Sequence, residues 1–224
     1  PTEGVPIPST PPRRHKLAWR DICDMAAHGA DQHPIAARIA PIAFWSMLRR
    51  EDLRQLNRFM WRELHNADPR DVPALANARG EVWGFRVHPN KTATTSNRTV
   101  DCPMPPFLHG AINAAFEESQ WLFPHPVDPK MPISAVLMTR RVKALLTASG
   151  FAGHQLRDFR RSGMWGVKDM GGEQSDIFAI SGHPLLGQAS MGDVYMPPDT
   201  RAACRAIAAA CRTLAVQKAR EEEG

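Results

Sequence analysis

The sequence of 224 residues lacks the motifs that mark most metal and nucleotide enzymes. It has no HExxH, no P-loop and no GxGxxG pattern, so we expect neither a metal nor an organic cofactor. Its four cysteines form no CxxC pair and no disulfide-dense pattern, which favours a reducing, cytoplasmic compartment. No apolar run approaches the ~20 residues of a membrane span, and the N-terminal residues do not form a signal peptide, so we expect no membrane association.

Tyrosine is the scarcest residue type, because Tyr195 is the only one in the chain. It follows His183 by twelve residues, and Arg160 precedes that histidine by twenty-three. An arginine, a histidine and a tyrosine in this order suit a phosphoryl-transfer site that works without a metal, because cations hold the phosphate while a phenol attacks it.

Basic residues exceed acidic ones, with a formal net charge of +5 and a pI of about 9.4. This balance suits a polyanionic partner such as nucleic acid. Hydrophobic residues make up 43% of the chain, enough for the core of one domain. We therefore predict a Pro-rich linker over residues 1–16, one domain over residues 17–220 and a solvated acidic tail over residues 221–224.

Apolar periodicity predicts a mainly α-helical fold with a small antiparallel β-hairpin. The hairpin pairs strands 81–88 and 97–102, with Lys91 in the polar turn between them. Pro41 is expected to kink one helix, and the helical segment after Arg49 is expected to continue through Phe59 and Met60. The other predicted helices cover residues 17–27, 34–48, 105–119, 134–149, 157–170, 174–181 and 199–220.

Five short blocks occur in the order typical of the catalytic domain of tyrosine recombinases, the phage-integrase family. Residues 46–53, Ser-Met-Leu-Arg-Arg-Glu-Asp-Leu, resemble the family's Thr-Gly-Leu-Arg-x-x-Glu-Leu, with Met47 in place of the glycine. Residues 90–92 and 97–100 resemble its lysine hairpin. Residues 179–183, Ala-Ile-Ser-Gly-His, and the tyrosine that follows resemble its last two blocks. The resemblance covers residues 13–215 and implies that the Pro-rich start is the linker after an N-terminal DNA-clamping domain.

The second arginine block can be aligned in two ways. His154-Gln155-Leu156-Arg157 spells the family's His-x-Leu-Arg literally. Arg157-Asp158-Phe159-Arg160-Arg161-Ser162 matches the fuller His-Asp-Leu-Arg-Arg-Thr pattern and puts Arg160 at the common interval before His183. We prefer the second alignment, in which Arg157 takes the position of the motif's histidine.

The resemblance implies a bacterial or phage-encoded recombinase or integrase of mobile elements that cleaves double-stranded DNA and stores the bond as a 3′-phosphotyrosine on Tyr195. Arg49, Arg160 and His183 would bind the phosphate, with Arg157 beside them, and Lys91 would protonate the leaving oxygen. Asp52 would orient a cation. A tetramer on paired DNA sites is the expected assembly.

Two other functions remain open: a type IB topoisomerase-like nicking and closing enzyme, and a catalytically impaired DNA-binding remnant. Each residue also has a plainer interpretation: Arg49 and Asp52 as a surface pair, Lys91 as a solvated side chain, His183 as a helix cap. The apolar stripe of the 199–220 helix is expected to dock onto a neighbouring protomer when DNA is bound, and packing within its own chain is the alternative.

Overall fold

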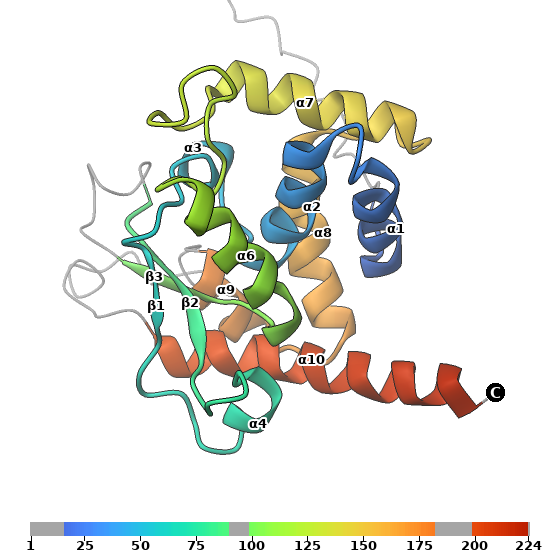
Figure 1. The fold of residues 1–224 in the computed structure, drawn as a ribbon. Helices are drawn as coiled ribbons and strands as arrows, with labels where there is room; N and C mark the ends of the chain where they lie inside the picture. The colour runs from blue at the N-terminus through green and yellow to red at the C-terminus, as the bar shows by residue number, and fades with distance from the viewer. Residues whose placement is uncertain (1–15, 90–98, 182–198, 224) are drawn as a thin grey trace, which may run out of the picture.

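A computed structural model describes residues 16–89, 99–181 and 199–223 (Figure 1). The fold is mostly helical with one small antiparallel sheet, which confirms the predicted fold class. Its strands are β1 (Trp61–Glu63), β2 (Trp83–Val87) and β3 (Val100–Pro103). Its helices are α1 (Trp19–Gly29), α2 (Pro34–Ser46), α3 (Arg50–Leu53), α4 (Val72–Leu75), α6 (Pro106–Glu118), α7 (Ala135–Ala148), α8 (Leu156–Asp169), α9 (Gln174–Ser181) and α10 (Thr200–Glu223). None of these helices combines the length and the apolar composition needed to cross a membrane.

The three strands lie in the order β1-β2-β3, and both neighbouring pairs are antiparallel. The predicted hairpin is confirmed by the pairing of β2 with β3, which ends at Val87 opposite Val100. Lys91 belongs to the connection between these two strands and lies outside the described residues. The sheet has one more strand than expected, because β1 pairs with the other edge of β2.

The helix expected to continue through Phe59 and Met60 is a wrong prediction, since α3 ends at Leu53. The side-chain carbonyl of Asn57 accepts hydrogen bonds from the backbone N–H groups of Phe59 at 3.0 Å and Met60 at 3.3 Å. A side chain that bonds to nearby backbone in this way competes with the helical pattern and favours a turn. The chain therefore turns here and enters β1.

Helix α2 lies at the centre of the helical layer, packed against α1, α7 and α8. Phe44 and Trp45 on α2 are fully buried, and Pro41 is accommodated inside the helix. Gly163 of α8 lies so close to α2 that an added Cβ would stand 1.9 Å from the carbonyl oxygen of Phe44. The missing side chain therefore lets α8 approach the end of α2, where Arg49 follows.

The apolar stripe of α10 packs within its own chain, fully at Ala203, Ile207 and Ala210 and partly at Cys211 and Leu214, which is the alternative to docking onto a neighbouring protomer. Ala203, Ile207 and Ala210 are at most 1% exposed, and α10 packs on α4, α8, α9 and β3. Asp199, the first residue of the predicted 199–220 helix, caps α10 by accepting a hydrogen bond from the N–H of Ala202 at 2.9 Å. The helix runs on to Glu223, so residues 221–223 form its exposed last turn instead of a separate tail.

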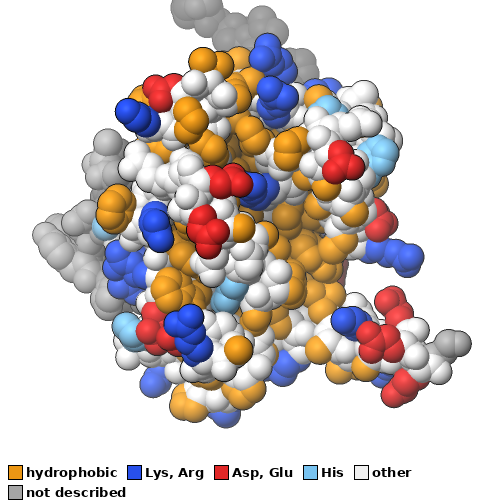
Figure 2. All heavy atoms as spheres, in the orientation of Figure 1, with side chains coloured by type: hydrophobic (Ala, Val, Ile, Leu, Met, Phe, Trp, Pro, Cys, Tyr) orange, Lys and Arg blue, Asp and Glu red, His pale blue; other side chains and the backbone are white. Residues whose placement is uncertain are grey.

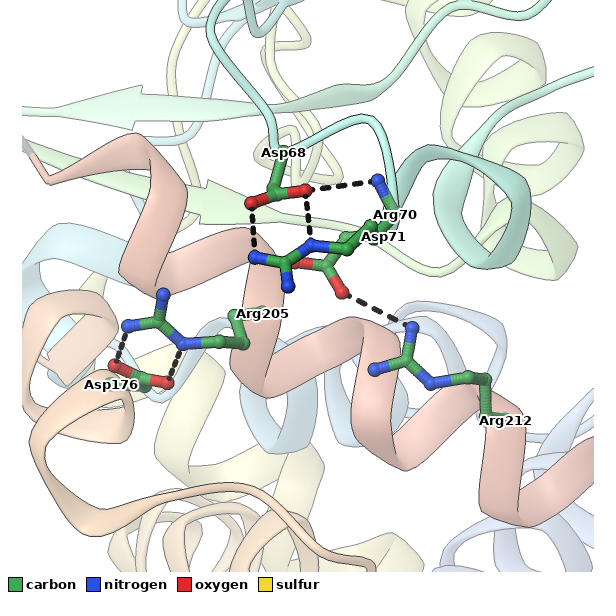
Figure 3. A network of polar contacts seen from close by, with 6 residues as sticks. All are labelled: Asp68, Arg70, Asp71, Asp176, Arg205 and Arg212. Atoms are coloured by element: carbon green, nitrogen blue, oxygen red, sulfur yellow. Dashed lines mark hydrogen bonds and ion pairs between the residues drawn. The ribbon is translucent and has the colours of Figure 1, made fainter.

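Two arginine–aspartate pairs connect α10 to the segments beside it (Figure 3). Arg205 donates two hydrogen bonds of 2.6 Å to Asp176 of α9. Arg212 donates one of 3.1 Å to Asp71, which precedes α4. We call these two pairs the α10 clamp.

The face of the molecule in Figure 2 carries acidic and basic side chains interspersed, with an apolar hollow between α1 and α6. Trp19 of α1 and Phe107 of α6 lie 5.8 Å apart between ring centroids, and both contact the ring of Trp45. Charge of a single sign does not gather on this face.

Candidate active site

A cavity of about 850 Å³ opens between α3, α7 and the beginning of α8. Five of its lining side chains are cationic and two are acidic. The cations are Arg49, Arg50, Lys143, Arg157 and Arg160, and the acids are Glu51 and Asp52. Three of the residues predicted for the catalytic site, together with the acidic residue expected to orient them, therefore meet at one cavity.

Arg49 reaches the cavity because the chain reverses sharply after α2. Met47 ends that helix in the left-handed conformation, with φ of 51° and ψ of 25°. Glycine adopts this conformation without strain, which explains why the resembling family block has glycine here. Met47 occupies it while fully buried, and Arg49 follows as the half-buried residue that precedes α3.

Asp52 in the first turn of α3 is buried, with only 3% of its surface exposed. Arg160 lies half-buried in the second turn of α8, and its guanidinium donates a hydrogen bond of 3.0 Å to the carbonyl of Ser181. Burial and the nearby charge of Arg49 lower the pKa of Arg160 from 12.5 to about 10, while Asp52 acts in the opposite direction. Arg49, Asp52 and Arg160 therefore form one electrostatic cluster.

The two candidate alignments of the second arginine block place their arginines differently. Arg157 is exposed and lines the cavity at the start of α8, one turn before Arg160. His154 is half-buried and packs edge-on against the ring of Phe151, with centroids 5.6 Å apart. Arg160 is the one that shares the cluster with Arg49, as the preferred alignment expects, although the catalytic roles of both arginines remain predictions.

His183 and Tyr195 lie outside the described residues, and the residues on either side of that segment bond to strand β3. At one end, the thiol of Cys102 on β3 donates to the carbonyl of Ile180 at 4.0 Å. At the other, the hydroxyl of Thr200 donates to Asp101, also on β3, at 2.6 Å. The chain thus leaves α9 and returns to α10 beside the same strand, with Arg160 bonded to the last residue of α9.

Sequence reasoning missed five polar residues that line the cavity: Arg50, Glu51, Thr139, Lys143 and Gln155. The basic run Arg140-Arg141-x-Lys143 was a usable signal, but a helix turns by 100° per residue and only packing shows which basic residue faces the cavity. Among the residues that the structure describes, no group of three or more His, Cys, Asp or Glu side chains is arranged to hold a metal ion.

Comparison of the sequence with protein-family models and with curated proteins finds no match. Solved structures do match. A lambda integrase (75–356) dimer bound to a COC′ core site aligns with a TM-score of 0.58 and 11% identity over 79% of this chain and 60% of that one. The chain has the tyrosine recombinase catalytic-domain fold. The lambda integrase catalytic core aligns with a TM-score of 0.56 and 12% identity over 83% of this recombinase-fold chain and 99% of its own.

A third solved structure is the XerH site-specific recombinase bound to difH substrate in a pre-cleavage complex. It aligns with a TM-score of 0.56 and 9% identity over 76% of the recombinase-fold chain and 47% of its own. The chain therefore spans 60% or less of the length of these two DNA-bound proteins. At such identities the likeness establishes the fold, and the function has to be argued from the site.

Proposed function

We propose that this chain is the catalytic domain of a site-specific recombinase that cleaves and rejoins DNA through a 3′-phosphotyrosine. The observation that carries the proposal is the convergence of Arg49, Asp52 and Arg160 at one cation-lined cavity of this fold. The solved structures that share the fold include recombinases bound to DNA, which supports double-stranded DNA as the partner.

Two arginines suit the charge that develops in phosphoryl transfer. The non-bridging oxygens gain negative charge in the transition state, and a planar guanidinium binds two of them at once. Partial burial of Arg160 strengthens this interaction, because less water competes for the charge. By analogy with other donors to a developing oxyanion, each arginine contributes ~3 kcal/mol to the transition state. Asp52 orients the pair and takes no part in the chemistry.

Tyr195 attacks the phosphorus in this proposal, and the bond to the 5′-oxygen breaks. Lys91 gives the leaving oxygen its proton, and His183 donates a hydrogen bond to the phosphate. Attack by a second 5′-hydroxyl on the phosphotyrosine reverses the step and releases the enzyme, so no external energy source is needed. The phenol has an ordinary pKa of about 10, and the neighbouring cations favour its ionised form.

Strand exchange between two sites requires both strands of each site to be cleaved, and we propose a tetramer on paired DNA sites for this purpose. The integration or excision of a mobile element would follow from the same chemistry. A type IB topoisomerase would share the covalent intermediate but return each strand to itself.

The covalent intermediate is the first thing to test. A nicked suicide substrate, from which the released strand diffuses away, should trap a DNA–protein adduct on a denaturing gel, and Tyr195→Phe should abolish it. An adduct that persists in this variant would contradict the assignment of Tyr195. Absence of any adduct in the wild type, with DNA binding intact, would favour the DNA-binding remnant. Joined strands from two sites, as opposed to relaxed plasmid alone, would distinguish a recombinase from a topoisomerase.

A further inference from the structure

Besides Arg50, which pairs with Glu51, two cations at the cavity have no task in the proposed phosphoryl transfer. Lys143 enters from α7, and exposed Arg157 enters from the first turn of α8. An α-helix rises 1.5 Å per residue, so Arg157 lies about 4.5 Å nearer the start of α8 than Arg160 does. Arg160 is half-buried and Arg157 is exposed, so Arg160 lies deeper in the cavity.

The structure holds Lys143 in place without neutralising it. Its ammonium donates to the carbonyl of Ala152, in the loop between α7 and α8, and an ammonium has three donors. Within the described ranges, neither Lys143 nor Arg157 forms an ion pair with a carboxylate. The cavity thus keeps net positive charge on the side that α7 and the start of α8 provide.

The acidic residues of the cavity do not offset this charge. Glu51 is shared between two arginines, at 2.8 Å from a guanidinium nitrogen of Arg50 and 2.8 Å from that of Arg54. Asp52 is buried, and its charge acts on Arg160. Thr139, one turn before Lys143 on the same face of α7, adds a hydroxyl at 3.5 Å from Arg50.

We propose that Lys143 and Arg157 form a second phosphate-binding subsite, which takes a DNA phosphate next to the one that is cleaved. The inference rests on the proposed function and extends it. Successive phosphates follow one another along a strand, so a strand held at Arg160 must bring its neighbouring phosphate to the cavity wall. A cavity of about 850 Å³ has room for more than one phosphate group. The subsite sets the position and direction of the strand and reads no bases.

The salt dependence of DNA binding tests the subsite, because each neutralised phosphate adds about 0.9 to the slope of log K against log salt. The probe is a short duplex of arbitrary sequence, titrated at several salt concentrations with proteins that all carry Tyr195→Phe to prevent cleavage. Lys143→Gln and Arg157→Gln should each reduce the slope by about one and weaken binding at low salt. Lys143→Arg should restore the slope, because arginine keeps the charge.

Arg141→Gln is the matched control. Arg141 is exposed on the same helix but two residues before Lys143, which turns its side chain about 200° away. The slope of log K against log salt for Arg141→Gln should equal that of the Tyr195→Phe parent. The unfolding midpoints should be alike in all variants. Unchanged slopes for Lys143→Gln and Arg157→Gln, with a steep slope for the parent, would overturn the subsite and leave the proposed function standing. A parent protein without salt-dependent binding would overturn both.

Discussion

Arginine serves opposite purposes in the α10 clamp and in the cavity. In the clamp, Arg205 and Arg212 each meet a buried aspartate, so every charge has an opposite partner within the chain (Figure 3). In the cavity, five cations share two carboxylates, and one of those two is already bound by Arg50 and Arg54. The charges of the clamp are balanced within the chain, whereas the cavity has an excess of positive charge that can bind an anionic ligand.

The arginines of the two regions differ in how they change the free energy of folding. A guanidinium fork on a buried carboxylate stabilises the fold, because breaking it leaves a charge that water no longer solvates. Arg160 instead carries its charge into a partly buried place, where burial and Arg49 disfavour the charge more than Asp52 favours it, so its pKa is lowered. Stability is thus given up at the cavity, as is common where a site must bind charge.

The largest effect should be on strand cleavage. Arg160→Lys should slow single-turnover cleavage at saturating DNA by about 100- to 1,000-fold, because lysine cannot reproduce the bidentate contact with two phosphate oxygens. Arg157→Lys keeps the charge at the outer subsite and should lose much less. If Arg157→Lys is the inactive variant, the literal His154-x-x-Arg157 alignment is correct and the cluster of Arg49 with Arg160 is not catalytic.

The backbone that delivers Arg49 to the cavity gives the next largest effect. Met47→Gly would relieve about 1 kcal/mol of left-handed backbone strain but would remove a fully buried side chain, which costs about 2–5 kcal/mol. The free energy of unfolding in urea should therefore fall by about 2 kcal/mol. Asn66→Gly is the control, since Asn66 also has a left-handed φ, of 72°, but is exposed and should change stability by less than about 0.5 kcal/mol. A more stable Met47→Gly would show that strain outweighs packing.

The smallest effects should differ in size between the two regions. Arg205→Met leaves Asp176 buried without its fork and should lower the free energy of unfolding by about 1–2 kcal/mol. Arg160→Met removes a poorly solvated charge but also the cation beside buried Asp52 and the donor to Ser181, so it should change the free energy of unfolding by less than Arg205→Met does, while abolishing cleavage. Equal losses in both variants would show that the contrast between clamp and cavity is false.

The lowered pKa of Arg160 also makes the stability of the fold depend on pH. The pKa of Arg160 is lower in the folded chain, at about 10, than its ordinary value of 12.5. Between these values the unfolded chain holds more protons, so this residue makes stability rise with pH. Below about pH 10 the residue is charged in both states and its full cost is present. The difference in stability between Arg160→Met and the parent should therefore stay constant from pH 6 to pH 9 in urea titrations.

Local signals in the sequence were enough to predict most of the helices. Ser134 accepts the capping hydrogen bond from Leu137, Gly171 adopts a positive φ of 94° after α8, and Asp199 caps α10, all at expected boundaries. Strand β1 was missed because three residues are too few for an alternating pattern. The side-chain hydrogen bonds of Asn57 that end the helical run could not be inferred from periodicity.

Site residues that belong to a motif could be predicted from the sequence, whereas those placed only by the packing of helices could not. Arg49 and Arg160 are more than one hundred residues apart, and their meeting was predicted because the order of the blocks implies the fold. Lys143 belongs to no motif, and its place at the cavity depends on how α7 rotates against α3 and α8. The burial of the α10 stripe in its own chain depended likewise on which elements surround that helix.

The attachment of both α9 and α10 to strand β3 has a consequence for how such chains diverge. Asp101 and Cys102 are sequence neighbours, and between them they hold Thr200 and Ile180, the two sides of residues 182–198. Length can change between two fixed anchors at little cost, since doubling a connection adds only about 0.6 kcal/mol of closure entropy. A change in the number of residues between His183 and Tyr195 would therefore leave both anchors on β3 in place.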